Sequence, residues 1–63
     1  MEKPPRVGDR VVVPFGIRDV EGEVFRVEGK ARTWVTVELF LDGGEEPTLM
    51  TYLLREVRPA EAA

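Results

Sequence analysis

Two pairs of closely spaced acidic residues are the first candidates for chemistry in this sequence. Glu21 and Glu23 lie two positions apart, so in a strand they share a face and could share a proton or a cation. Glu45 and Glu46 are neighbours in a glycine-rich stretch and could act in the same way. For both pairs the alternative is a solvated surface with no chemical role.

The groups that catalysis needs most often are missing from the sequence. There is no Ser, Cys or His, which removes the usual nucleophiles and the imidazole base. The Thr residues fall in strand-like runs, where β-branched side chains are favoured in any case. A domain of this length also has little room for a cleft that excludes water. We therefore predict that the chain is not an enzyme and has no catalytic residues.

Metal and cofactor binding have equally little support. With no Cys or His, a metal would need oxygen ligands, and residues 42–46 offer the densest group of carboxylates. This segment lacks the spaced Asp and Asn residues of a calcium loop. Its Asp42-Gly43-Gly44 sequence is instead typical of a hairpin turn. We expect no metal and no cofactor.

Two large aromatic side chains are the first candidates for binding. Residues 32–42 read RTWVTVELFLD, which predicts a strand with one buried aliphatic face and with Trp34 and Phe40 on the other. Along an ideal strand these two lie roughly 20 Å apart, so they would serve different places. Either neighbouring strands cover them or they are exposed, and an exposed apolar patch usually marks an interface. The buried face would consist of Val35, Val37, Leu39 and Leu41.

A basic hairpin supplies the second set of binding candidates. Arg26, Lys30 and Arg32 flank the predicted turn before this strand, and Phe25 and Trp34 lie close by in the sequence. Cations mixed with aromatics can bind single-stranded nucleic acid by pairing with phosphates and stacking on bases. Alternatively, the arginines pair with glutamates across the strands. The formal net charge of −3 disfavours nucleic acid as a partner.

The elements that must position these residues are short strands. Five Pro and six Gly divide the chain into runs rich in Val, Thr and aromatics, which indicates an all-β fold. The second run changes its apolar face midway, so a bulge or bend is expected at Gly22. Met50 and Tyr52 are expected to point inward. Apolar residues three apart predict one 3₁₀ turn over 54–57. The predicted strands span 10–14, 20–28, 33–41, 48–53 and 57–58, with a loop at 15–19 between the first two.

The 63 residues suffice for one domain, with a core over about 6–59 and tails at 1–5 and 60–63. No apolar run approaches the roughly 20 residues of a membrane span. The N-terminal residues lack the apolar segment of a signal peptide. We expect a cytoplasmic protein with no membrane contact.

The order of these features resembles the small SH3-like barrels, which include KOW, Tudor and photosystem-subunit-E-type domains. The matching segments are VGDRVVVP, VEGEVFRVEG, DGG and LLREVRP, and the resemblance covers Arg6 to Pro59. It implies a five-stranded SH3-like barrel with a one-turn 3₁₀ helix before the last strand. The step from Gly22 to Val24 is similar to the KOW core, but KOW domains tend to be basic here and this chain is acidic over 19–23. Tudor domains use an aromatic cage, for which the candidates are Phe15, Phe25, Trp34, Phe40 and Tyr52.

The sequence therefore predicts a non-catalytic module for protein–protein interaction or assembly, either an accessory subunit or a self-associating homodimer. Strand addition at an open sheet edge is a second route to a partner. The alternative is a KOW-like nucleic-acid-binding module that uses the basic hairpin over 26–34. The binding candidates are Phe25, Arg26, Lys30, Arg32, Trp34 and Phe40.

Overall fold

A computed structural model describes residues 4–41, 43 and 46–60, which form a five-stranded antiparallel sheet with a single 3₁₀ turn. The all-β prediction is confirmed, and the 3₁₀ turn lies where the leucine-rich segment predicted it. The elements are β1 (Arg10–Phe15), β2 (Arg18–Glu28), β3 (Trp34–Leu39), β4 (Thr48–Leu53), η1 (Leu54–Glu56) and β5 (Arg58–Pro59).

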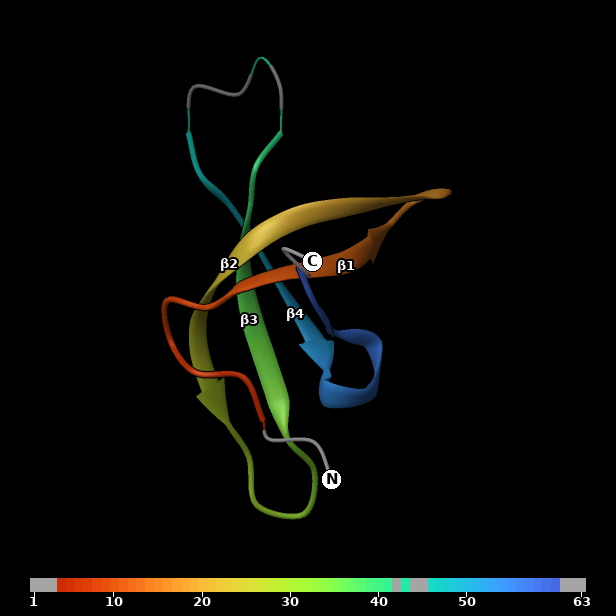
Figure 1. Cartoon of the computed structure of the whole chain (residues 1–63). Coiled ribbons are helices and arrows are strands. Elements are labelled where there is room, and N and C mark those ends of the chain that lie inside the picture. The colour runs from red at the N-terminus through yellow and green to blue at the C-terminus, as the bar shows by residue number, and fades with distance from the viewer. Residues whose placement is uncertain (1–3, 42, 44–45, 61–63) are drawn as a thin grey trace.

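The sheet is open, so the closed barrel expected from the sequence is not observed. The strand order is β4-β3-β2-β1-β5, which leaves β4 and β5 as the two edges. β5 is only two residues long, and Pro59 cannot donate a backbone hydrogen bond to a further strand. Figure 1 shows the β1–β2 hairpin crossing the β3–β4 pair. The buried core residues come from all four of these strands.

The long strand β2 joins the two halves of the sheet. Its first half pairs with β1 and its second half pairs with β3, and Gly22 lies opposite Val11 on one side and Leu39 on the other. A Cβ atom on Gly22 would lie 2.5 Å from the carbonyl oxygen of Glu38. Only glycine therefore lets the strands approach this closely.

The bulge in β2 lies further along the strand than the sequence predicted. The register between β2 and β3 shifts between Val24 and Arg26, not at Gly22. The extra residue is Phe25, so Phe25 and Arg26 both stand on the face that points away from the core, and Val27 returns to the core. The sequence predicts that the apolar face of β2 changes, but it does not predict that Phe25 is the extra residue of the bulge.

Several connections are tighter than expected. The predicted loop over 15–19 is a two-residue turn, because Phe15 pairs with Arg18 and Gly16 takes a positive φ of 68°. β3 ends at Leu39 rather than at 41, whereas β4 has the predicted bounds. The Asp42-Gly43-Gly44 turn is described only at Gly43, which has a φ of 78°; Asp42, Gly44 and Glu45 lie outside the described residues.

One apolar core fills the space between the crossing strands. Tyr52 points inward as predicted, with 7% of its surface exposed. Met50 shares that side of β4 but is exposed, because it lies near the open edge of the sheet. The predicted wall on β3 is confirmed for its three residues within the strand. The buried core comprises Val11, Val13, Val20, Val24, Val35, Val37, Leu39 and Tyr52.

Candidate functional site

Trp34 begins β3 on the side of the sheet that points away from the core. It lies opposite Leu53 of β4 and Glu28 of β2, and 40% of its surface is exposed. Its neighbour Val35 is fully buried, which fixes the indole on the outer side of the strand. Trp34 is therefore held by its strand while its ring remains available to a partner.

A polar pair supports the sheet beside Trp34. Thr36 faces outward yet is only 9% exposed. Its hydroxyl lies 2.9 Å from that of Thr51, the residue opposite it in β4. On its other side Thr36 pairs with Arg26, next to the bulged and half-exposed Phe25. The two hydroxyls satisfy each other, so this part of the surface presents little unsatisfied polarity.

Four apolar side chains surround this threonine pair. Leu49 lies opposite Glu38 and Leu53 lies opposite Trp34, so both stand on the outer side of β4. Leu49 is exposed and Leu53 is partly buried. We call this surface the outer apolar face and define it by Phe25, Trp34, Leu49 and Leu53.

Phe40 lies apart from this surface. It follows the end of β3, and the guanidinium carbon of Arg10 stands 4.8 Å from the centre of its ring. Arg10 is also 3.5 Å from the carboxylate of Glu21, whose backbone oxygen accepts the Phe40 N–H at 3.0 Å. The Arg10 guanidinium already occupies one side of the Phe40 ring, although 43% of the surface of Phe40 is exposed.

The predicted basic residues are all exposed but have different surroundings. The ion pairs among the described residues join Arg10 to Glu21 and Arg58 to Asp19. Arg26, Lys30 and Arg32 have no carboxylate within 4.0 Å among those residues, so the expected cross-strand pairing is not seen for them. Within this part of the chain, all three side chains are exposed to solvent.

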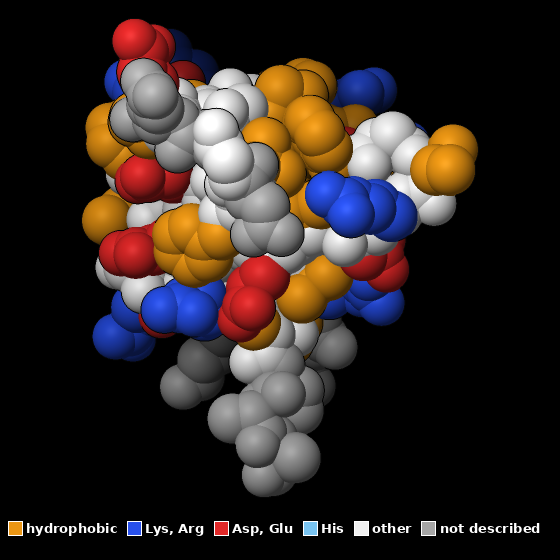
Figure 2. Space-filling model, turned by 90° about the horizontal axis from the view of Figure 1, so that it is seen from above, with side chains coloured by type: hydrophobic (Ala, Val, Ile, Leu, Met, Phe, Trp, Pro, Cys, Tyr) orange, Lys and Arg blue, Asp and Glu red, His pale blue; other side chains and the backbone are white. Residues whose placement is uncertain are grey.

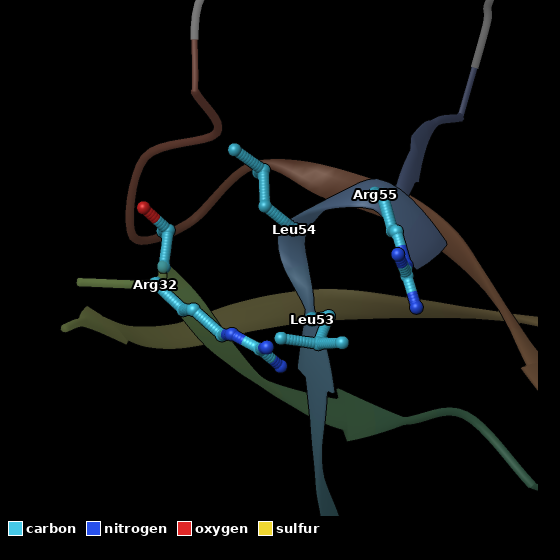
Figure 3. Close-up of a pocket in the computed structure, with 5 residues that line it drawn as sticks. Arg32, Leu53, Leu54 and Arg55 are labelled. Atoms are coloured by element: carbon cyan, nitrogen blue, oxygen red, sulfur yellow. The ribbon is translucent and has the colours of Figure 1, made fainter.

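A shallow depression of about 360 Å³ joins the basic hairpin to η1. Figure 3 shows the side chains of Arg32 and Arg55 on either side of Leu53. The structure holds the two segments together through the Leu54 N–H, which donates to the Thr33 carbonyl oxygen at 3.0 Å. Arg55 was not predicted, since no spacing in the sequence indicates that η1 packs beside residue 32.

Charged and apolar side chains are interspersed on one face of the molecule. On the face seen in Figure 2, hydrophobic side chains form several separate patches with basic and acidic groups between them. Beside the outer apolar face, Arg26 lies opposite Thr36 and Glu28 lies opposite Trp34, so a partner that binds this face also meets charges at its margin.

The acidic pair Glu21 and Glu23 lies on an exposed part of the sheet. Glu21 and Glu23 share the outer side of β2, and Glu21 is engaged with Arg10. No three acidic residues among 4–41, 43 and 46–60 lie close enough together to hold a metal ion. Within the same residues no helix has the length and apolar character needed to cross a membrane.

Tyr52 is a buried side chain with a raised pKa. Burial raises its pKa above the usual 10.0, and the negative charge of Glu56 raises it further. Its hydroxyl is buried without a hydrogen-bond partner among those residues. Tyr52 does not line the depression between the arginines, so this polar atom belongs to the core and not to the candidate site.

Comparison with family models, with curated proteins and with solved structures gave no match. The support for the candidate site therefore comes from the geometry described above.

Proposed function

We propose that this chain is a non-catalytic protein-binding module with an SH3-like arrangement of strands. The long bent strand β2 and the one-turn 3₁₀ helix between β4 and the short β5 support that relationship. A domain of this size contributes by presenting a surface, either to an enzyme as an accessory subunit or to another copy of itself.

The observation that carries the proposal is the exposed Trp34 within the outer apolar face. Trp residues are common anchors of protein interfaces, because a large rigid ring buries much surface at little cost in conformational entropy. The threonine pair at the centre of this face is already satisfied, so covering it would leave no hydroxyl without a partner. Arg26 and Glu28 lie beside the apolar residues and supply charges at the margin.

Two substitutions test the role of this face. Trp34→Ala removes the proposed anchor, whereas Phe40→Ala removes an aromatic ring of similar exposure at the other end of β3. The protein is immobilised and exposed to a lysate of its native host, and the retained proteins are quantified by mass spectrometry. We expect Trp34→Ala to weaken the specific capture by about 30-fold, the loss of one interface anchor worth about 2 kcal/mol.

Phe40→Ala should leave this capture nearly unchanged, provided that circular dichroism shows both variants folded. Equal capture by the wild type and the folded Trp34→Ala variant would contradict the proposed role of the outer apolar face. Capture that disappears only in Phe40→Ala would move the binding site to the Arg10 end of the sheet.

A second candidate function is binding of single-stranded nucleic acid in the depression between Arg32 and Arg55. The observation that favours it is the pair of guanidinium groups without carboxylate partners among the described residues. Trp34 lies opposite Leu53, which lines the depression, and could stack on a base. The acidic net charge opposes this function.

A further inference from the structure

The outer edge of β4 lacks the charged residues and prolines that often protect an exposed strand. Its six residues, TLMTYL, carry no charge and no Pro. Leu49, Met50 and Thr51 are exposed in succession, so both sides of the strand reach solvent at this edge. At the other edge of the sheet, β5 is short and ends in Pro59. The edge of β4 is therefore the one suited to pairing with another strand.

The hydrogen bonds of β4 show which backbone groups face this edge. Leu54 donates to Thr33 at 3.0 Å, in the register that places Leu53 opposite Trp34. Because the backbone N–H and C=O groups of successive residues point in opposite directions, those of Thr48, Met50 and Tyr52 point toward β3. The groups of residues 49, 51 and 53 then point away from β3 toward the open edge.

One of these three outward positions already has a partner for its donor. The Leu53 N–H donates to the carboxylate of Glu56 at 3.0 Å. Leu49 and Thr51 each direct an N–H and a C=O away from β3. Among the described residues these groups have no backbone partner. Leu49 and Thr51 thus offer two donors and two acceptors at alternate positions, a pattern that matches their own antiparallel copy.

We propose that two copies of this chain associate by antiparallel pairing of their β4 strands, about a twofold axis at Met50. In this register Leu49 lies opposite the second copy's Thr51, and Thr51 lies opposite the second copy's Leu49. Each pair exchanges two N–H···O bonds, so the outward N–H and C=O groups of Leu49 and Thr51 are all satisfied. The proposal goes beyond the protein-binding function above, because the dimer forms at the β4 edge and leaves Trp34 free for a further partner.

The register is specific because each of its two nearest alternatives lacks a donor. An axis at Leu49 would place Thr51 opposite Pro47, which has no N–H. A twofold axis perpendicular to the sheet keeps both cores on the same side, so only residues on the same face can lie opposite each other. Moving the axis to Thr51 would place Leu49 opposite Leu53, whose N–H is bound to Glu56. The axis at Met50 avoids this competition.

Charges at the two ends of β4 also favour this occupant. The exposed Glu46 precedes the strand and the exposed Arg55 follows it, separated only by Pro47, β4 and Leu54. An antiparallel copy brings each Glu46 to the end of the sheet where the other copy's Arg55 lies. The second edge, closed by Pro59, prevents further addition, so association stops at two chains.

This dimer would place two outer apolar faces on the same side of one continuous sheet. Each face keeps its Trp34, and a partner with two matching surfaces could contact both faces at once. Such bivalent binding strengthens a weak contact without adding any new type of interaction.

A cysteine cross-link tests the position of the axis. Residues opposite each other without mutual hydrogen bonds have Cα atoms about 4.5 Å apart, within the range of about 4.4–6.8 Å that a disulfide accepts. The chain has no cysteine of its own, so Met50→Cys provides a single reporter. Ile17→Cys, in the exposed β1–β2 turn, is the matched control for random collision.

Under mild oxidation we expect Met50→Cys to form covalent dimers at least about tenfold faster than Ile17→Cys, since the dimer raises the local thiol concentration. Equal rates for the two variants, or wild-type protein that sediments at 7.1 kDa up to millimolar concentration, would overturn the proposal.

A second variant separates backbone pairing from contact between side chains. Leu49→Pro removes one outward N–H but keeps an apolar side chain on the outer apolar face, and an edge strand tolerates Pro where its N–H faces solvent. We expect this variant to remain folded and to sediment near 7.1 kDa, at concentrations where the wild type approaches twice that mass. A folded variant that still dimerises would exclude the β4 edge as the interface.

The two functional proposals fail in different ways. A wild type that stays monomeric, yet captures a protein through Trp34, would overturn the β4 dimer and leave the protein-binding function standing. If the wild type dimerises through Met50 and the Trp34→Ala variant still captures the same proteins, the β4 dimer stands and the binding role of the outer apolar face is overturned.

Discussion

The hydroxyl of Tyr52 is the one side-chain polar atom of the described core that has no hydrogen-bond partner. An unsatisfied buried hydroxyl loses its contacts with water without replacement, which costs free energy. We expect Tyr52→Phe to raise the free energy of unfolding by about 1 kcal/mol, measured by urea denaturation at pH 7. The apolar packing of the ring in the core is retained.

Thr36→Val is the matched control, since it also exchanges a hydroxyl for an apolar group. Thr36 does have a partner, so this change leaves the Thr51 hydroxyl unpaired and should lower stability by about 1 kcal/mol. If both substitutions changed the free energy of unfolding in the same direction, the presence of a hydrogen-bond partner would not explain the effect.

The raised pKa of Tyr52 also gives the stability a defined dependence on alkaline pH. Burial keeps the folded side chain neutral above pH 10.0, where the unfolded chain begins to lose this proton. The folded state then binds more protons than the unfolded state, so the free energy of unfolding falls as pH rises above about 10. Tyr52→Phe should lose less stability than the wild type over this window, and an identical decline would contradict the assignment.

At the scale of elements, the crossing of the strands depends on Gly22. A methyl group there would lie 2.5 Å from the Glu38 oxygen and 2.6 Å from a methyl carbon of Val37, so β2 and β3 would have to separate. We expect Gly22→Ala to lower the free energy of unfolding by about 2–3 kcal/mol, measured by chemical denaturation.

Gly16→Ala serves as the comparison for Gly22→Ala. A Cβ atom on Gly16 meets nothing within 4 Å, but its φ of 68° disfavours alanine. This variant should lose only about 1 kcal/mol, the cost of the left-handed backbone alone. A larger loss at Gly16 than at Gly22 would show that turn strain, not strand approach, limits the fold.

The sequence predicted the elements better than their irregularities. Alternation marked the inner residues of β3, and turn residues bounded β4, because both signals act within a few positions of the chain. The bulge at Phe25 could not be placed, since it depends on the register with β3. The burial of Thr36 has the same origin, because it requires Thr51 from another strand.

The candidate site was predictable in part for a similar reason. The separation of Trp34 from Phe40 follows from their spacing along one strand, and the structure places them in different surroundings. The contact of Phe40 with Arg10 and the depression shared by Arg32 and Arg55 join residues far apart in the chain. No local pattern reports such pairs, so they appear only when the chain is folded.

For the whole molecule, the net charge of −3 limits how strongly nucleic acid can bind. The depression offers Arg32 and Arg55, so about two phosphates would be neutralised, and binding to a single strand would weaken with salt with a logarithmic slope of about −1.4. We expect weak binding of a labelled single-stranded oligonucleotide at low salt and no measurable binding near physiological salt, with fluorescence anisotropy as the measurement.

Two variants test which arginines take part. The double variant Arg32→Glu, Arg55→Glu should abolish even the weak binding, whereas Arg18→Glu, in the distant β1–β2 hairpin, should retain it. Tight binding at physiological salt with a much steeper slope would mean that more basic residues take part, and nucleic acid would then replace protein as the proposed partner.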